Sequence, residues 1–201
     1  MPVPIRADIQ DTMARPLTSE EFHAIARLNP RNAELLERLP ALRLNQCHLA
    51  AGCLFQAAWN HLSGRPADWG VSDYDIFYFD DRDLSWEAED AVIQQANAIF
   101  ADLGARIELR NQARVHLWFP ERFKAAYPQL HSARDGIDRY LIPCTCVGID
   151  VDSGELYAPN GLDDLTAGIL RMNPLLPQPE MFLRKAQSYR ERWPWLTIAE
   201  T

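Results

Sequence analysis

The spacing of hydrophobic residues changes several times along the chain, and each change marks an expected element. Helical spacing with capping signals at its ends predicts helices over about 18–28, 33–39, 86–103, 164–170 and 179–190. Thr18 and Glu21 form a capping-box pattern at the start of the first of these helices. Ser85 is a suitable N-cap for the third helix, and Gly104 ends it.

Short runs of β-branched and aromatic residues predict the strands. The clearest run is 74–79, Tyr-Asp-Ile-Phe-Tyr-Phe, whose weak alternation is typical of a central strand buried on both faces. Further strands are expected over about 106–109, 115–119, 144–151 and 155–157. The mixed order of helices and strands predicts an α+β fold, in which a mixed β-sheet is flanked by helices.

Residues 44–62 are compatible with two different structures. Apolar residues from Cys47 to Leu62 recur at helical spacing, which predicts one amphipathic helix. Alternatively, a short buried strand covers 46–51, Gly52 turns the chain, and a helix covers 53–62. Periodicity alone does not separate the two structures.

Length and composition set the class of protein. The chain has 201 residues, of which 47% are hydrophobic and 24% charged, as in an ordinary globular protein. We expect a single domain over 1–201, with a core over about 44–160, a helical lead over 18–40 and a helical tail over 163–190. Its four cysteines lack zinc-site spacing and are expected to be reduced and buried: Cys47, Cys53, Cys144 and Cys146.

Charge and hydropathy limit the partners and the location. A net charge of −8 argues against broad nucleic-acid binding through the phosphate backbone, which needs a dense basic face. No apolar run approaches the ~20 residues needed to span a bilayer. The N-terminus lacks the apolar core of a secretory signal, so we expect a cytoplasmic protein without membrane partners.

Two carboxylates stand at the start of the strongest predicted strand. Asp73 and Asp75 are two residues apart, so in a strand both side chains point to the same face. Two buried like charges repel each other unless a cation lies between them. Mg²⁺ prefers carboxylate and phosphate oxygens, and a pair of such ions can clamp the oxygens of a phosphoryl transfer. In the alternative interpretation, Asp73 caps a turn and Asp75 lies at a solvated strand end.

Three further residues are candidates for the same site. Glu108 lies between apolar residues in a predicted strand, so it is either a third metal ligand or an exposed strand carboxylate. Gly52 precedes a possible helix start, where backbone N–H groups can approach a triphosphate. Arg114 follows Glu108 and is either a bidentate phosphate ligand or a solvated residue at a strand end.

These residues, in this order, resemble the DNA polymerase beta-type nucleotidyltransferase superfamily. Its pattern has an apolar residue and Gly-Gly or Gly-Ser at a strand-to-helix turn, Asp-x-Asp on the next strand, and a carboxylate on a later strand. The counterparts here are Ala51-Gly52-Cys53, Asp73-Tyr74-Asp75 and Glu108. Cys53 stands where Gly or Ser is usual, and the stretch between the turn and the aspartates is longer than typical.

A closer likeness extends over most of the chain. An uncharacterised bacterial nucleotidyltransferase-like family of this superfamily is similar in the strings Trp59–Leu62, Asp73–Ile76, Ser85–Asp90, Arg110–Trp118, Tyr157–Pro159 and Gly161–Leu165. The resemblance implies a nucleotidyltransferase-like core with helical N- and C-terminal additions. It favours the strand–Gly52–helix structure for 46–62.

The resemblance also implies an activity. The expected function is metal-dependent transfer of a nucleoside monophosphate from an NTP to an acceptor hydroxyl, with two Mg²⁺ ions and Mn²⁺ as the alternative ion. Asp73, Asp75 and Glu108 would be catalytic residues and metal ligands, while Gly52, Cys53 and Arg114 would bind the nucleotide. The alternative is a non-catalytic nucleotide- or partner-binding module on the same fold. The acceptor, the preferred base and the oligomeric state do not follow from the sequence.

Overall fold

A mixed five-stranded β-sheet forms the centre of the computed structural model, which describes residues 15–199. The strand order is β3-β2-β1-β4-β5; β2 and β3 are parallel, and the other neighbours are antiparallel. The strands are β1 (His48–Ala50), β2 (Asp73–Tyr78), β3 (Arg106–Asn111), β4 (Gly148–Asp150) and β5 (Leu156–Tyr157). The predicted α+β class with a mixed sheet is therefore confirmed.

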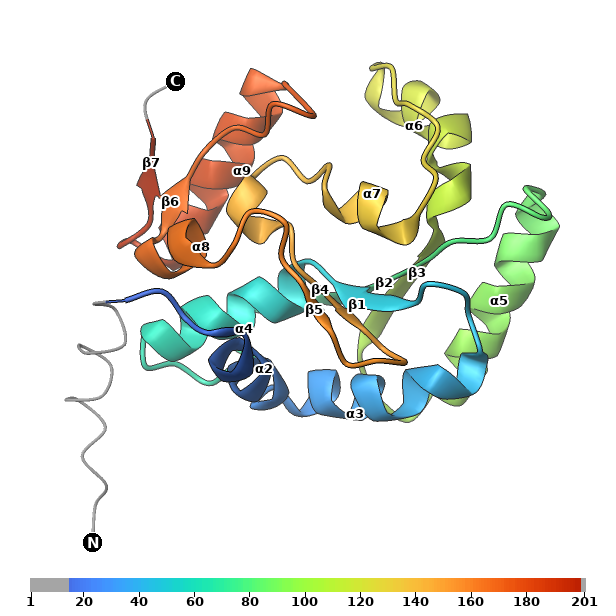
Figure 1. Ribbon diagram of the computed structural model, residues 1–201, viewed down its shortest axis with the longest axis horizontal. Coiled ribbons are helices and arrows are strands. Elements are labelled where there is room, and N and C mark those ends of the chain that lie inside the picture. Colours follow the sequence, from blue (N-terminus) through green and yellow to red (C-terminus); the bar gives the residue numbers. More distant parts are fainter. Residues whose placement is uncertain (1–14, 200–201) are drawn as a thin grey trace, which may run out of the picture.

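Helices cover both sides of this sheet. In Figure 1, α2, α3 and α4 lie on one side, and α6, α7 and α9 lie on the other. The α-helices are α2 (Ser19–Arg27), α3 (Pro30–Arg38), α4 (Gly52–Leu62), α5 (Trp86–Ile99), α6 (Val115–Phe123), α7 (Ala133–Ile137), α8 (Asp163–Ala167) and α9 (Pro179–Arg192). Three short 3₁₀ helices are η1 (Leu39–Leu42), η2 (Gln112–Arg114) and η3 (Pro143–Thr145). None of the helices within 15–199 is long and apolar enough to cross a membrane.

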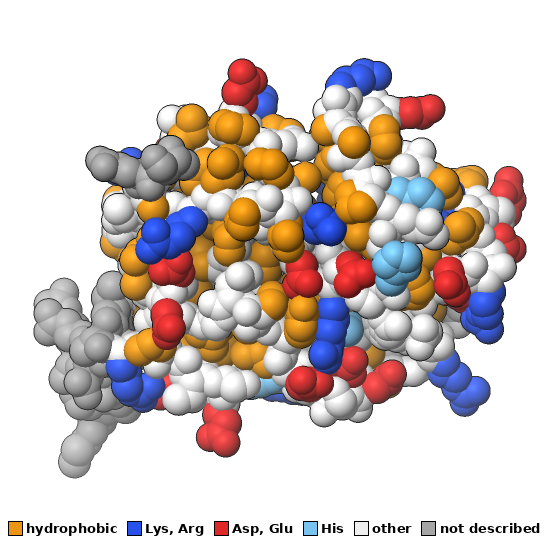
Figure 2. All heavy atoms as spheres, turned by 45° about the horizontal axis from the view of Figure 1, so that its top comes forward, with side chains coloured by type: hydrophobic (Ala, Val, Ile, Leu, Met, Phe, Trp, Pro, Cys, Tyr) orange, Lys and Arg blue, Asp and Glu red, His pale blue; other side chains and the backbone are white. Residues whose placement is uncertain are grey.

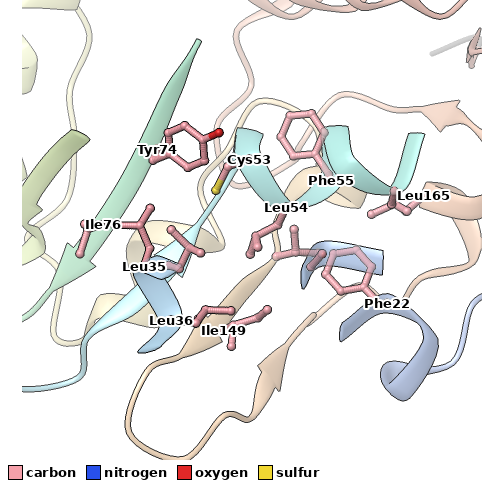
Figure 3. Close-up of a cluster of buried hydrophobic side chains, with 14 of the residues drawn as sticks. Phe22, Leu35, Leu36, Cys53, Leu54, Phe55, Tyr74, Ile76, Ile149 and Leu165 are labelled. Atoms are coloured by element: carbon pink, nitrogen blue, oxygen red, sulfur yellow. The ribbon is translucent and has the colours of Figure 1, made fainter. Parts of the chain in front are cut away.

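Strand β2 separates the hydrophobic core from a polar face. Its residues Tyr74, Ile76 and Tyr78 are buried, whereas the alternate residues, which include both aspartates, are only partly buried. Figure 3 shows Tyr74 and Ile76 packed with apolar side chains from α3, α4 and β4. The prediction of a strand buried alike on both faces is therefore wrong. One face of β2 packs in the core, and the other carries the carboxylates.

The C-terminal segment docks against α4 through two tryptophans. The Trp59 indole N–H donates to the carbonyl oxygen of Leu165 at 3.0 Å, and the Trp193 indole N–H donates to Asn60 Oδ1 at 3.0 Å. Both indoles are fully buried, and burial of a large aromatic side chain with its N–H satisfied is strongly stabilising. This docking places α9 above the polar face of β2. A two-stranded parallel sheet, β6 (Ile169–Leu170) and β7 (Thr197–Ile198), lies beside it and was not predicted.

Residues 44–62 adopt the strand–turn–helix structure, and the single-helix alternative is wrong. The strand is shorter than 46–51, since it comprises His48–Ala50. The residue that makes the turn is Ala51, not Gly52 as predicted: Ala51 has φ 61° and ψ −131°, its N–H donates to the Val147 carbonyl oxygen, and Gly52 is the first residue of α4. Such a conformation is costly for a residue with a Cβ, so the surrounding structure must hold it in place.

The expected strand over 115–119 is instead the start of helix α6. Asn111 ends β3 and turns the chain, because its side chain accepts hydrogen bonds from the backbone N–H groups of Asp80 and Ala113. Val115 and Phe119, four residues apart, are both buried, whereas Leu117 is 49% exposed. A strand would have placed all three on one face; the structure follows helical spacing.

Other boundaries differ less from prediction. Helix α3 begins at Pro30 rather than at 33, because Asn29 caps it and proline suits the first helical position. The helix expected over 164–170 ends at Ala167, where Gly168 adopts φ 69° and leads into β6. The helix expected over 86–103 ends at Ile99. Helix α7 was not predicted, and 144–146 is not part of a strand.

Candidate active site

The parallel pairing of β2 and β3 brings the predicted carboxylates to one face of the sheet. Asp75 is the Cα partner of Glu108, and Asp73 is the partner of Arg106. Residues two apart on a strand share a face, and so do paired residues on adjacent strands. Asp73, Asp75, Arg106 and Glu108 therefore lie on the face opposite to the core.

Asp73 and Asp75 line a cavity of about 380 Å³ between the sheet and the helices above it. Helix α4 contributes Gly52 at its first position. The other side is formed by residues far along the chain: Phe119 from α6, Arg139, Tyr140 and Ile142 after α7, and Met181, Lys185 and Tyr189 from α9. Figure 2 looks onto this side of the molecule, where a notch separates the lobe of α8 and α9 from the lobe of α6.

Negative charge concentrates at the bottom of this cavity. Burial, followed by the nearby carboxylates of Asp73 and Glu108, raises the pKa of Asp75 to about 7, against the opposing effects of Lys185 and Arg110. A carboxyl group with so high a pKa is poorly solvated and lacks a compensating cation. The cavity is therefore suited to a ligand or ion that brings positive charge to Asp75.

Two polar groups of the cavity wall have no hydrogen-bond partner. They are the hydroxyl oxygen of Tyr140 and Nε of Arg139, both buried. Burial raises the pKa of Tyr140 well above its ordinary value, and the nearby charge of Asp75 adds to the rise. Buried polar groups almost always find partners, and an unpaired one costs free energy. Both residues line the cavity, although these two atoms are themselves buried in its wall.

Glu108 lies beside the two aspartates, but its carboxylate forms an ion pair with Arg106. Its Oε1 lies 2.6 Å from Nη2 of Arg106, two residues earlier on the same strand. It does not line the cavity with Asp73 and Asp75. Within residues 15–199, no group of three or more His, Cys, Asp or Glu side chains is arranged to hold a metal ion. The structure thus brings the two aspartates together, with Glu108 adjacent to them and paired with Arg106.

Gly52 and Cys53 face in different directions. Gly52 lines the cavity, and a Cβ built there would lie 2.7 Å from Nε2 of Gln56. The side chain of Cys53 is fully buried on the core side, where its thiol donates to the Ala50 carbonyl oxygen at 3.4 Å. Burial raises the pKa of this thiol well above its usual value. Cys53, predicted to bind the nucleotide, therefore does not line the cavity with Gly52.

Arg114 lies outside the carboxylate cavity. Its Nη1 donates to the buried carboxylate of Glu89, and its Nε donates to the Leu84 carbonyl oxygen at 2.9 Å. It lines a second cavity of about 450 Å³, together with Trp86, Trp118 and other residues. Arg114 is thus held in a buried ion pair that joins η2 to helix α5.

Lys185, Arg139 and Tyr140 were not identified from the sequence. They lie more than sixty residues beyond Asp75, and only the docking of α9 and of the segment after α7 brings them to the cavity. Tyr140 packs edge-on against Phe77 of β2, with ring centroids 5.9 Å apart. No local motif marks these residues, since each is an ordinary residue of a helix or a loop.

Comparisons with known proteins give one family match and one structural match. A family model described as a nucleotidyltransferase matches residues 37–198. A solved NMR structure, described as revealing a CCA-adding enzyme head domain, superposes with a TM-score of 0.70 at 26% sequence identity. The match covers 92% of this chain and 97% of that one. No curated protein matches at significant similarity.

Proposed function

This chain belongs to a nucleotidyltransferase family, and we propose that it transfers a nucleoside monophosphate from an NTP to an acceptor hydroxyl. The observation that carries the proposal is the placement of Asp73 and Asp75 in one cavity with Gly52 and two unpartnered donors. In the reaction, the acceptor oxygen forms a bond to the α-phosphorus. The bond from that phosphorus to the bridging oxygen breaks, and pyrophosphate leaves.

A divalent cation fits the donor set. Asp73 and Asp75 offer the hard oxygen ligands that Mg²⁺ prefers, and the raised pKa of Asp75 reflects negative charge that a cation would relieve. We expect two Mg²⁺ ions, with Mn²⁺ as the alternative, and Glu108 as the third ligand once its carboxylate leaves Arg106. When bound, such ions offset the charge of carboxylates and phosphates and make a bound hydroxyl more acidic.

The protein groups have separate tasks in this proposal. Backbone N–H groups at the start of α4, next to Gly52, donate to phosphate oxygens, as helix N-termini do in other phosphate sites. Tyr140 and Arg139 donate to the sugar–phosphate part of the nucleotide from the opposite wall. Glu108 accepts the proton of the acceptor hydroxyl.

A second candidate is a nucleotide-binding module without catalysis. The Arg106–Glu108 ion pair favours it, because a carboxylate held at 2.6 Å by arginine is neither a free base nor a metal ligand. The described neighbour is itself a head domain, that is, part of an enzyme. Binding of NTP without any transfer would support this candidate.

Nucleotide binding is tested first, by calorimetry of each NTP with Mg²⁺ and with EDTA. Asp75→Asn should lose the Mg²⁺-dependent part of the affinity, because it removes one of the two carboxylates in the cavity. Asp81→Asn is the matched control, since Asp81 is exposed and follows β2 outside the cavity. Equal NTP affinity of the wild type in Mg²⁺ and EDTA would contradict a metal-dependent site.

Transfer is tested by pyrophosphate release and by the mass shift of candidate acceptors incubated with each NTP. Activity in the wild type that is lost in Asp75→Asn and retained in Asp81→Asn supports catalysis. Binding without release across the screen supports the module instead.

A further inference from the structure

The cavity that Arg114 lines lies where α5, α6 and the end of β3 meet. It has a volume of about 450 Å³. Small-molecule sites commonly span roughly 300–1,000 Å³, so this space is large enough for one small ligand. Helix α6 borders both this cavity and the carboxylate cavity, since Trp118 lines the first and Phe119 lines the second.

Two tryptophans give this cavity aromatic walls. Trp86 is the first residue of α5, and 55% of it is exposed, although it is one of the largest apolar residues. The Arg114 guanidinium lies 5.6 Å from the centre of the Trp86 ring, and the buried ion pair with Glu89 fixes this arginine in place. Trp118 contributes a second indole from α6. A planar ligand that stacks on these rings removes apolar surface from water, so the walls favour an aromatic ligand.

The charged groups of the cavity are suited to an acid. Arg110 and Arg122 line it, and within residues 15–199 neither of them forms an ion pair. The carboxylates of its lining are Glu89, which Arg114 neutralises, and Glu121, which is exposed. Two uncompensated cations thus face one solvated carboxylate. Arginine binds a carboxylate or a phosphate through two parallel hydrogen bonds, so the cavity favours an anionic ligand.

Arg110 connects this cavity to the proposed catalytic residues. It follows Glu108 by two residues on β3, so both side chains lie on the same face of the sheet, about 7 Å apart along the strand. Glu108 is in turn the register partner of Asp75. The charge of Arg110 opposes the rise in the pKa of Asp75, so the two groups are near each other. Glu108, the proposed base, therefore lies between this cavity and Asp75.

We propose that this cavity binds the acceptor, and that the acceptor is a small molecule with a planar ring, an acidic group and a hydroxyl. The ring stacks on Trp86 and Trp118. The acid binds Arg110 and Arg122, and the hydroxyl is directed toward Glu108. The hydroxyl oxygen bonds to the α-phosphorus of the NTP, its proton passes to Glu108, and pyrophosphate leaves. This assignment rests on the proposed function, since it takes the ligand of the carboxylate cavity to be an NTP. The net charge of −8 favours one small acid over a long nucleic-acid strand.

Binding is measured by calorimetry in EDTA with two ring-bearing acids, AMP and para-hydroxyphenylacetate. Adenosine and tyrosol are their counterparts without the acid, and inorganic phosphate is an acid without a ring. Both acids should bind more tightly than these three compounds, and the tighter acid shows whether a nucleotide or an aromatic carboxylate is the better fit. If neither acid binds, or if the acids bind no better than adenosine and tyrosol, the proposal is overturned.

Variants locate the binding in the cavity. Trp86→Ala should weaken both acids by about tenfold, as for the loss of one stacked ring, and Trp86→Phe should retain most of the affinity. Trp69→Ala is the matched control, because Trp69 is 40% exposed, has Arg65 over its ring at 4.0 Å, and lies outside the cavity. Arg122→Gln should weaken the acids and leave tyrosol unchanged, whereas Arg190→Gln, at an exposed position of α9 outside the cavity, should change neither. Equal losses in Trp86→Ala and Trp69→Ala overturn the proposal.

The outcome is separable from that of the proposed function. In transfer assays with MgNTP, Trp86→Ala should raise the KM of the acceptor about tenfold and leave the KM of the NTP unchanged. Asp75→Asn should abolish transfer and leave binding of the acids in EDTA unchanged. If Trp86→Ala uses its acceptor with an unchanged KM, the acceptor assignment fails and nucleotidyl transfer stands. If the acids bind through Trp86 and no nucleoside monophosphate is transferred to any compound, the ligand site stands and the proposed catalysis fails.

Discussion

Asp75 and Glu108 are register partners on parallel strands, but only Asp75 faces the cavity, because Glu108 is paired with Arg106 at 2.6 Å. This relationship connects the two candidate functions. A carboxylate released from Arg106 can join the aspartates, and one that stays paired cannot. The exposed side chain of Arg106, 73% accessible, makes the pair easy to break.

Replacing Arg106 should therefore favour metal binding. In Arg106→Gln, Glu108 loses its partner, and the Mg²⁺ concentration that gives half-maximal NTP binding should fall severalfold. Stability should change by less than about 1 kcal/mol, because exposed ion pairs contribute little. Titration of NTP binding with Mg²⁺, with thermal melts in parallel, measures both. Arg82→Gln, which breaks the exposed pair with Asp80, is the control; an identical response in the two variants would exclude a role for Glu108.

Gly52, the first residue of α4, supports a second prediction. A Cβ at this position would lie 2.7 Å from Nε2 of Gln56, which is the far end of a flexible side chain, so Gly52→Ala should fold after a small shift. Gly52→Val should lose NTP affinity at least tenfold, because a branched side chain would stand between the cavity and the backbone N–H groups of α4. NTP affinity and the melting temperature are measured for both variants.

Cys53→Ser tests whether the side chain next to Gly52 contributes to nucleotide binding. The thiol is buried toward the core, and a serine hydroxyl can donate to the same Ala50 carbonyl oxygen, so NTP affinity should be unchanged. Loss of affinity in Cys53→Ser together with normal binding in Gly52→Val would reverse the assignment of the two residues.

Local patterns predicted the parts of the site that depend on one element. Strand geometry placed Asp73 and Asp75 on one face, whereas the strand-to-helix turn before α4 was favoured over a single helix only by the family resemblance. The prediction of a strand over 115–119 was wrong. It followed the β-branched and aromatic composition of that segment, whereas the burial of its residues follows helical spacing. A pattern of few residues does not separate these two periods.

Long-range packing determined the parts that were not predicted. Lys185 and Tyr140 enter the cavity because Trp193 and Trp59 dock the C-terminal segment against α4 and its neighbours. Such contacts join residues that are far apart in sequence and leave no local spacing to recognise. The ion pair that occupies Glu108 likewise depends on side-chain geometry, since two residues of one strand merely share a face.

Variants of Arg114 distinguish a structural role of this residue from the predicted role in nucleotide binding. Its side chain is 9% exposed and is paired with Glu89, whose side chain is 2% exposed. Removing one partner of a buried pair costs about 3–5 kcal/mol, because the other charge stays buried alone. Arg114→Met should therefore melt well below the wild type, and Arg114→Met with Glu89→Met should recover part of the loss. If Arg114→Met retains its stability and loses NTP affinity, Arg114 binds the nucleotide.

The last prediction concerns the pH dependence of stability in the metal-free protein. Folding raises the pKa of Asp75 from 3.8 to about 7, chiefly through burial and then through Asp73 and Glu108. The native state therefore binds this proton more tightly than the unfolded state. The resulting stabilisation is complete below pH 4 and is lost as the pH rises through about 7.

Asparagine at position 75 has no charge to bury at any pH. In EDTA, Asp75→Asn should melt close to the wild type at pH 4 and above it at pH 8, by roughly 3–6 °C for a relief of 1–2 kcal/mol. Mg²⁺ with NTP should reverse the order at pH 8, because only the wild type gains binding free energy. Asp81→Asn should follow the wild type throughout, since Asp81 lies outside the cavity. If all three proteins shift equally with pH and with metal, Asp75 is neither a buried charge nor a ligand, and the proposed nucleotidyltransferase site is wrong.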